Sequence, residues 1–370
     1  MVVYQSAICP HTGEEFPIVM DLETCLPVQP IQRYINFCRK RGLANNTVRI
    51  YARRLVDYFK WLEPKSLDWK DIDLTELADF TNWYLLGGDV EVISEEVRET
   101  MSKRSPKTVN LTITAIQNMY EFHAIEGTID EKKFTKLSYR QSKRGGFLKG
   151  IVKSKPNKQK RIKLKEPKVF PGCLTDEQVL TLADTCRTWR DRLIFLLTRS
   201  TGIRRGELLG LRWCDLEDLD RRSAVRIVRR DDNPNKAYAK GKDREIFLVH
   251  YRDITLEAFQ GYCFEEYPAK AEELGHGMVF VNLQPGKYLG KPMSSSRVND
   301  IFKYLEKETG IEVYPHLNRH TLATRMLQEN HRDEVVQYTL GHKSIATTKD
   351  IYSHVLDEMT LADFLLGEEE

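Results

Sequence analysis

The sequence has no long apolar run, no recognisable export signal and no paired cysteine motif. None of its hydrophobic stretches approaches the roughly 18 residues of a membrane-spanning helix, and its first residues lack a basic region followed by an apolar core. Its seven cysteines are scattered, which is typical of reduced thiols in a cytoplasm. Cys9, His11 and Cys25 resemble half of a zinc site, but no second ligand pair follows at suitable spacing. We therefore expect a cytoplasmic protein without membrane segments, disulfides or a metal site.

Positive charge is concentrated in one part of this chain of 370 residues, whose length predicts two or three domains. Residues 139–168 hold twelve Lys or Arg and one acid, for a net charge of +11, whereas the whole chain carries +3. Glycines, prolines and few apolar residues favour a flexible linker there. So many cations are costly to hold together without an anion, which favours contact with nucleic acid over a solubilising role. The candidate contacts are Lys153, Lys155, Lys158, Lys160 and Arg161.

The pattern before this basic segment is mainly helical. Residues 1–28 predict short strands around a turn, and from Pro30 apolar residues recur at helical spacing. Asn46 or Thr47 is the expected cap of a second helix, which ends at Pro64. Two more helices are expected over about 75–86 and from Ser105 to about 125. Four such helices fit a small all-helical bundle.

After the basic segment the pattern mixes helices with two strands. Thr175, followed by acids, is typical of a helix start, and 191–200 reads as a buried helix. The alternating stretches 224–228 and 244–249 predict strands, and further helices are expected over 254–271 and 295–309. The chain as a whole is therefore expected to be mostly α with a small antiparallel β-sheet.

Residues 314–354 gather reactive side chains in a helical setting. Pro315 suits the start of a helix to about 330, and His316 and Arg319, three apart, project from one face of it. A second helix is expected over 333–340, ended by Gly341, and a third from about 344. The reactive side chains are His316, Arg319, His342 and Tyr352.

These residue types suit an attack on a phosphodiester. Charge develops on the non-bridging oxygens, and the planar guanidinium of arginine is suited to bear it. A histidine can donate to the phosphate or move a proton. A phenol, with a pKa of about 10, can form a covalent intermediate once its site activates it. Each motif alone is common on ordinary helices, so the interpretation depends on their combination and order.

A further arginine motif, TGIRRGELLGLRW, runs from Thr201 to Trp213. With HLNRH, LGH and TTKDIYSHV following in that order, the chain resembles the tyrosine recombinase (phage integrase) family over about 175–356. The family pattern Thr-Gly-x-Arg-x-x-Glu maps the catalytic arginine to Arg204 and not Arg205, with Glu207 as the supporting acid. Residues 238–244 resemble the family's Lys-Gly-x-Lys-x-Arg hairpin with one residue fewer. This maps the catalytic lysine to Lys240 and leaves Lys242 as an alternative.

The resemblance implies a mechanism. Arginine and histidine side chains hold the scissile phosphate, Tyr352 attacks it to leave a 3′-phosphotyrosyl bond, and Lys240 acts as the general acid. Because arginines bear the charge, it implies neither a metal ion nor a cofactor. The implied catalytic residues are Arg204, Lys240, His316, Arg319, His342 and Tyr352, supported by Glu207.

The resemblance also implies a domain order and partners. Thr47 and Arg49 are the DNA-binding candidates of the first domain, because they lie in a stretch like the family's x-x-Thr-x-x-x-Tyr motif. The expected partners are double-stranded DNA with specific core sites and further copies of the chain, from dimer to tetramer, in a bacterial cytoplasm or nucleoid. Accessory proteins encoded by a mobile element stay open as partners. The expected parts are an extension at 1–28, a helical (SAM-like) DNA-binding domain at 29–136, a basic linker at 137–172, a catalytic domain at 173–356 and an acidic C-terminal helix at 357–370, which docks on its own domain or on a neighbouring subunit.

Within the family, the N-terminal residues are similar to those of transposase-A proteins of site-specific transposons. The similarity lies in Leu26-Pro27-Val28 and in the stretch from Asn46 to Tyr51. The expected function is therefore a recombinase that moves a mobile element. A phage or conjugative-element integrase is the main alternative, and a type IB topoisomerase, which relaxes DNA with a similar constellation, is less favoured. A DNA-binding protein with a dead site is weaker still, since all six catalytic positions hold reactive residues.

Overall fold

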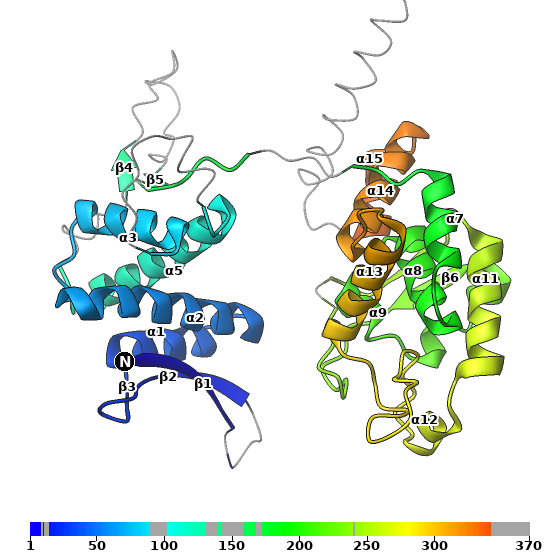
Figure 1. Cartoon of the computed structure of the whole chain (residues 1–370), viewed down its shortest axis with the longest axis horizontal. Helices are drawn as coiled ribbons and strands as arrows, with labels where there is room; N and C mark the ends of the chain where they lie inside the picture. The colour runs from blue at the N-terminus through cyan, green and yellow to red at the C-terminus, as the bar shows by residue number, and fades with distance from the viewer. Residues whose placement is uncertain are drawn as a thin grey trace, which may run out of the picture. The chain divides into compact units, whose positions relative to one another are not determined.

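The structure is a computed structural model that describes residues 1–8, 10, 15–88, 102–130, 139–141, 158–160, 162–167, 172–239 and 241–341. The chain divides into two compact units, Met1–Lys168 and Val169–Glu370, and each is described by itself (Figure 1). Both units are mainly helical and carry small antiparallel sheets, which confirms the predicted fold class. In these ranges no helix combines the length and hydrophobicity needed to cross a bilayer.

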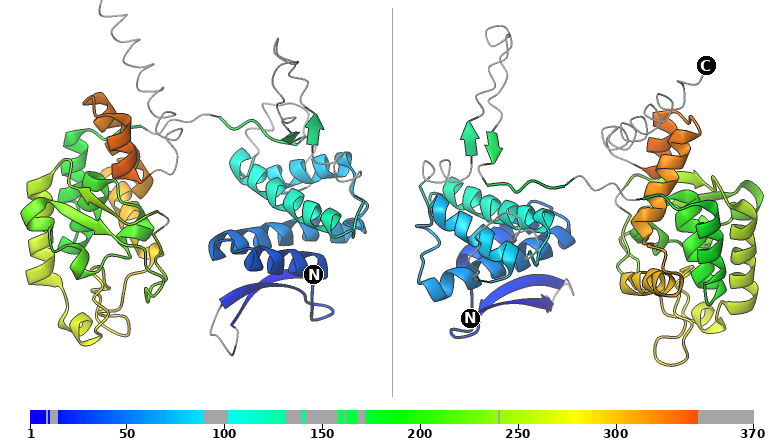
Figure 2. Two further views of the ribbon diagram at one scale, coloured as in Figure 1. Left: turned by 180° about the vertical axis from the view of Figure 1, so that it is seen from behind. Right: turned by 45° about the horizontal axis from the view of Figure 1, so that its top comes forward.

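The first unit packs helices against an N-terminal sheet of order β1–β2–β3. Tyr4 of β1 pairs with Val19 of β2, and the sheet lies against the first two helices, as Figure 2 shows from two further sides. Because β1 and β2 come from residues 1–28, the prediction of short strands there is confirmed. The elements are β1 (Val2–Ile8), β2 (Glu15–Asp21), β3 (Leu26–Pro27), α1 (Gln29–Lys40), α2 (Asn45–Leu62), the 3-10 helix η1 (Glu63–Lys65), α3 (Leu74–Leu86), α5 (Pro106–Ile125), β4 (Tyr139–Gln141) and β5 (Lys158–Lys160).

The helices of this unit follow local signals in the sequence, with one exception. Ser105 caps α5, its hydroxyl accepting a hydrogen bond from the Thr108 N–H at 3.3 Å, as helix starts favour. The expected cap of α2 is wrong: Ala44 occupies the N-cap and makes no side-chain hydrogen bond. The helix begins at Asn45, so Asn46 and Thr47 already lie in its first turn. The predicted stripe of α1 is buried and consists of Ile31, Tyr34, Ile35 and Cys38.

The basic segment contains regular structure that the sequence analysis did not predict. Strands β4 and β5 pair antiparallel, with Tyr139 opposite Lys160. Beyond β5, the Leu164 N–H donates to Oδ1 of Asn110 at 2.8 Å, and Asn110 Nδ2 donates to the Leu164 carbonyl at 2.9 Å and to Glu166 Oε1 at 2.7 Å. The side chain of Leu164 also packs on the core of the first unit. Residues 162–167 are thus attached to α5 and are not part of a freely flexible linker.

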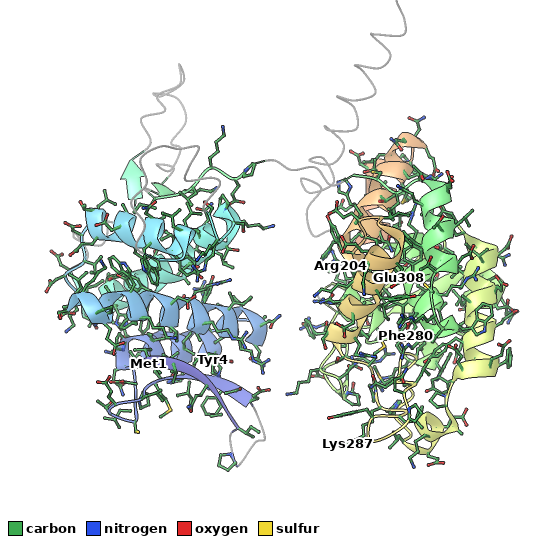
Figure 3. All side chains as sticks on the ribbon, viewed as in Figure 1. Met1, Tyr4, Arg204, Phe280, Lys287 and Glu308 are labelled. Atoms are coloured by element: carbon green, nitrogen blue, oxygen red, sulfur yellow. The ribbon has the colours of Figure 1, made fainter. Side chains whose placement is uncertain are left out.

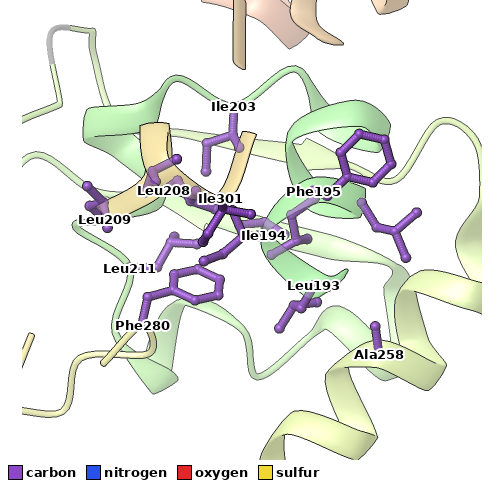
Figure 4. Packing of buried hydrophobic residues seen from close by; sticks show 14 of the residues in the cluster. Leu193, Ile194, Phe195, Ile203, Leu208, Leu209, Leu211, Ala258, Phe280 and Ile301 are labelled. Atoms are coloured by element: carbon purple, nitrogen blue, oxygen red, sulfur yellow. The ribbon is translucent and has the colours of Figure 1, made fainter. Parts of the chain in front are cut away.

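The second unit is built around α8, which packs against α-helices, a π-helix and a strand of the same unit. Figure 4 shows side chains of α8, of the turn after it and of α13 converging in one apolar core, among them Phe195, Ile203 and Ile301. The elements are α7 (Asp176–Asp184), α8 (Trp189–Thr201), α9 (Arg205–Leu208), the 3-10 helix η2 (Trp213–Asp215), α10 (Leu219–Arg222), β6 (Ala224–Ile227), β7 (Arg244–Phe247), α11 (Arg252–Gly261), the π-helix η3 (Tyr262–Glu266), α12 (Ala269–Glu273), α13 (Ser295–Thr309), α14 (Pro315–Gln328) and α15 (Asp333–Leu340).

Most predicted elements of this unit are confirmed, and one is not. Thr175 caps α7 through the Gln178 N–H at 3.2 Å, and β6 pairs with β7 as an antiparallel hairpin. The single helix expected over 254–271 is interrupted: α11 passes directly into the π-helix η3, which ends at Glu266, and α12 begins only after Pro268. Proline lacks the N–H that a continuing helix needs and disfavours helical backbone just before it. The helices expected after 344 and over 357–370 lie outside the described residues.

Candidate active site

The end of α8 sets the position of Arg204, which is labelled in Figure 3. The hydroxyl of Thr201 accepts a hydrogen bond from the Ile203 N–H at 3.2 Å. Gly202 ends the helix with φ of 61°, a left-handed conformation that favours glycine. A Cβ on Gly202 would also lie 2.7 Å from Cδ2 of Leu340, so any other residue there would require the Leu340 side chain to shift. The Thr-Gly pair therefore turns the chain sharply, and Arg204 follows at the N-cap of α9.

Glu207 holds Arg204 by both backbone and side chain. The Arg204 N–H donates to Oε2 of Glu207 at 3.1 Å, and Arg204 Nη1 donates to Oε1 at 3.1 Å. The Glu207 side chain is fully buried. Arg205, by contrast, donates to Oδ1 of Asn299 at 2.6 Å. Arg204, and not Arg205, thus shares the Glu207 carboxylate, and its catalytic role stays a prediction.

A third arginine, which the sequence analysis did not single out, completes this cluster. Arg244 donates from Nη1 to Oε1 of Glu207 at 3.1 Å and from Nη2 to Oε2 at 2.9 Å, the two-pronged geometry of strong arginine–carboxylate pairs. Burial alone would raise the pKa of Glu207, but the hydrogen bonds and charge of Arg244, with the Arg204 N–H, bring that pKa below its ordinary value. The final arginine of the hairpin motif was the available signal for this residue.

Arg319 reaches the same place from α14. Its Nη1 donates to the Gly202 carbonyl at 2.6 Å, and its Nη2 donates to the Leu340 carbonyl. Arg204 Nη2 donates to the neighbouring carbonyl of Gly341 at 2.8 Å. The last carbonyls of a helix lack intrahelical partners and carry partial negative charge. The C-terminus of α15 therefore gathers two arginines that are far apart in the sequence.

The cluster carries an excess of positive charge. Within the described residues, the three guanidinium groups of Arg204, Arg244 and Arg319 surround one carboxylate, that of Glu207. Burial, followed by the charge of Arg204, lowers the pKa of Arg319 to about 9. Crowding of like charges disfavours the charged forms and is relieved by an anion. The described part of the chain shows no group of three or more His, Cys, Asp or Glu side chains suited to a metal ion.

The other predicted catalytic residues are only partly described. His316 is an exposed residue in the first turn of α14, three residues before Arg319. Lys240, His342 and Tyr352 lie outside the described residues. The chain on both sides of Lys240 nevertheless approaches the cluster. A Cβ on Gly206 would lie 2.7 Å from the Tyr238 carbonyl oxygen, and one on Gly241 would lie 3.3 Å from Arg244 Nη1.

The DNA-binding candidates belong to the first unit and the basic segment. Thr47 and Arg49 lie on α2, where Arg49 Nη2 is 2.7 Å from Oε2 of Glu15 on β2. Lys158 and Lys160 lie in β5. Lys153, Lys155 and Arg161 fall outside the described residues. These candidates belong to the first unit of the chain, and the arginine cluster belongs to the second.

This chain is similar to known proteins in both sequence and fold. The phage integrase family model matches residues 173–359, and the model of the phage integrase N-terminal SAM-like domain matches residues 31–127. Transposase A from transposon Tn554 of Staphylococcus aureus is 30% identical over 345 residues, which cover 92% of this chain and 91% of that protein. Tyrosine recombinase XerD of Lacticaseibacillus casei is 27% identical over 327 residues, covering 87% of this chain and 92% of that protein.

Two solved structures show the same fold at low sequence identity. A lambda integrase dimer bound to a COC′ core site matches 88% of this chain and 94% of that chain, with a TM-score of 0.58 and 17% identity. The Tn1549 transposon integrase in complex with transposon right end DNA matches 90% of this chain and 99% of that chain, with a TM-score of 0.58 and 18% identity. With the family models matched in both halves, the chain belongs to the phage integrase family of tyrosine recombinases.

Proposed function

We propose that this chain is a site-specific recombinase that cuts and rejoins DNA strands through a 3′-phosphotyrosyl intermediate and thereby moves a mobile element. The observation that carries the proposal is the cluster of Arg204 and Arg319 around Glu207 and the end of α15. Its excess positive charge suits a phosphodiester, and its arginines occupy the positions of the family motif. Membership of the phage integrase family supplies the type of reaction.

Cleavage is a transfer of the phosphoryl group from one oxygen to another. The phenol of Tyr352 gives its proton to a histidine of the site or to water as its oxygen attacks phosphorus, and the bond to the 5′ oxygen breaks. Lys240 gives that oxygen its proton, which leaves a 5′ hydroxyl. Attack on the phosphotyrosine by a 5′ hydroxyl from another strand restores a phosphodiester and frees Tyr352. The covalent intermediate conserves the bond, so religation needs no ATP.

The two arginines are held before DNA arrives. Glu207 and the carbonyls of Leu340 and Gly341 fix Arg204 and Arg319 in place. Donors that are already oriented toward developing charge lower a barrier more than donors that must reorganise during the reaction. Phosphate oxygens accept hydrogen bonds from the remaining guanidinium N–H groups, assisted by His316 and His342. Two parallel N–H donors on one arginine give a geometry that suits phosphate.

The proposed partners are double-stranded DNA and other copies of the chain. The solved lambda integrase is a dimer on its core site, and we infer a dimer or tetramer on DNA for this chain. The proposed divisions are those of the sequence analysis, with the DNA-binding domain at 29–136 and the catalytic domain at 173–356. The named relatives come from bacteria, which supports a bacterial cytoplasm or nucleoid as the location.

An assay with two DNA sites tests the function. A plasmid with two copies of the end sequence of the element that encodes the chain should be resolved into two circles, or inverted between the sites, without ATP or a divalent ion. The full-length similarity to a transposase favours this outcome over topoisomerase action. Relaxation of supercoiled plasmid without exchange of flanking sequence would contradict the proposal, and so would binding with no strand cleavage.

The basic segment should contribute the salt-dependent part of DNA binding. Changing Lys153, Lys155, Lys158, Lys160 and Arg161 together to glutamine removes five of its charges. Each neutralised phosphate contributes about −0.9 to the slope of log K against log salt, so removing five charges should flatten the slope by up to about 4.5. The measurement is a salt titration of binding to a site-bearing and a random duplex. Binding to both should weaken alike, because phosphate contacts carry no base information; an unchanged slope would show that the segment faces solvent.

A further inference from the structure

Arg244 is the third arginine of the cluster and has no role in the proposed chemistry. It is the first residue of β7, directly after the β6–β7 connection, and its side chain is 6% exposed. Both of its terminal nitrogens donate to the two oxygens of Glu207. Arg204 binds the same two oxygens from the other side. The Glu207 carboxylate therefore lies between Arg244, which is buried, and Arg204, which is 24% exposed.

Arg244 also lies against two glycines that flank predicted catalytic residues. A Cβ on Gly341 would lie 2.7 Å from Cζ of Arg244, and one on Gly241 would lie 3.3 Å from its Nη1. Gly241 directly follows Lys240 in the sequence, and Gly341 directly precedes His342. Only glycine allows the guanidinium so close at position 341, where φ is also 61°. One side chain thus touches α9, the hairpin connection and the end of α15.

We propose that Arg244 is a positioning residue, which fixes Glu207 and through it Arg204, and which sets the backbone at Gly241 and Gly341 against the same cluster. This inference rests on the proposed function. Arg244 directs both of its terminal nitrogens to Glu207, whereas Arg204 directs only one to it and is 24% exposed, so we assign phosphate binding to Arg204 and not to Arg244. Its effect on the reaction is therefore indirect and passes through Arg204.

The pairing explains why the position requires a guanidinium. A buried carboxylate between two arginines keeps its charge only while its hydrogen bonds are complete, because burial favours the neutral acid. A lysine supplies the positive charge but a single point of attachment, whereas arginine spans both oxygens. Without Arg244, burial of Glu207 is opposed only by Arg204 and the charge of Arg319, and the pKa of Glu207 rises. A protonated Glu207 loses an acceptor for Arg204, so Arg204 is then held less firmly at low pH.

The test compares Arg244→Gln and Arg244→Lys with a matched control, Arg222→Gln. Arg222 pairs with Glu245 of the same hairpin at 3.1 Å but is 55% exposed. The first readout is the single-turnover rate of covalent adduct formation at saturating protein, measured from pH 5 to 9 beside the affinity for DNA. The second is the rate of amide hydrogen exchange in the peptide that contains Arg204, measured without DNA.

Arg244→Gln should slow adduct formation by about 10²-fold, the loss typical of a catalytic group displaced by about 1 Å, with DNA affinity changed less than about threefold. Its rate should fall further as the pH is lowered, over a range where the wild-type rate is constant. The double variant with Glu207→Gln should lose this pH dependence. Arg244→Lys should keep the wild-type pH profile and recover part of the rate. The lysine variant also allows the inference to be tested if the glutamine variant does not fold.

Hydrogen exchange separates this inference from the proposed function. The Arg204 N–H, which donates to Glu207, should exchange faster in Arg244→Gln and not in Arg222→Gln, whether or not the protein cleaves DNA. Unchanged exchange and an unchanged pH profile would overturn the role of Arg244. Faster exchange in a protein whose wild type forms no DNA adduct would support the positioning role and overturn the proposed recombinase chemistry instead.

Discussion

The Tyr352→Phe variant should bind its DNA site as tightly as the wild type and form no covalent protein–DNA adduct. Phenylalanine keeps the aromatic ring, and therefore its packing, but lacks the oxygen that would bond to phosphorus. Loss of the nucleophile is not compensated by the arginine cluster, because electrostatic stabilisation of a transition state requires a bond to be forming. The measurement is electrophoresis in hot detergent after incubation with an end-labelled nicked site. Under these conditions the covalent complex of wild-type protein and DNA stays intact.

Tyr338 offers a matched control for this experiment. It lies on α15, two residues before the motif that begins at Leu340, and it is 56% exposed. Tyr338→Phe removes the same hydroxyl from a nearby tyrosine and should leave adduct formation within about twofold of the wild type, as for most surface substitutions. An adduct that persists in Tyr352→Phe and disappears in Tyr338→Phe would move the nucleophile to α15 and refute the assignment made from the family pattern.

The parts of the fold that could be predicted are those that neighbouring residues determine. Thr175 and Gln178 cap α7 reciprocally across three residues, and Gly341 ends α15 in the left-handed conformation. Helix α13 has the predicted bounds, since its apolar period, its serine start and Gly310 all agree. In each case the determining contacts lie within one helical turn. Sequence spacing alone is then enough to place the element.

The parts that could not be predicted depend on contacts between distant residues. Ile50 is an apolar residue of α2 that is 37% exposed, because the sheet and the neighbouring helices bury the face that holds Val48, Ala52 and Leu55. The hydrogen bonds between Asn110 and Leu164 leave no local signal in a segment dominated by charge. Pro268 is a local signal for the break before α12, although the apolar residues on both sides of it recur at helical spacing.

The candidate site divides in the same way. The two arginine motifs of the sequence identified Arg204, Glu207 and Arg319, and the structure brings these three residues together. The sequence could not show that Arg244 shares the carboxylate of Glu207, since the two residues are 37 positions apart and each is ordinary in its own segment. Nor could it show that the end of α15 attracts both arginines, because helix-end carbonyls have no side-chain signature. Residue identity thus predicted the chemistry, and tertiary contacts determine how that chemistry is held in place.

Lys240→Ala should slow strand cleavage by about 10²–10⁴-fold, the usual contribution of a general acid. The 5′ oxygen leaves as an alkoxide, a very strong base, unless a proton reaches it as the bond breaks. A substrate with sulfur in place of the bridging 5′ oxygen leaves as a thiolate, and a thiol has a pKa of only about 8.5. That substrate should restore cleavage by the alanine variant to nearly the wild-type rate, in single-turnover assays that compare the oxygen and sulfur substrates.

Lys242 is the control that the sequence itself provides, because the shortened hairpin left both lysines open. Lys242 is exposed, whereas Gly241 between the two lysines packs toward Arg244 and Glu207. Lys242→Ala should therefore cleave the oxygen substrate within a few-fold of the wild type and gain nothing from sulfur. A sulfur rescue seen with Lys242→Ala, and absent with Lys240→Ala, would transfer the acid two residues along the chain. Rescue of neither variant, with both slow, would mean that the lysines bind DNA and that the proton comes from another group. The ratio of sulfur to oxygen rates thus identifies the acid even if both variants weaken DNA binding, because affinity affects both substrates equally.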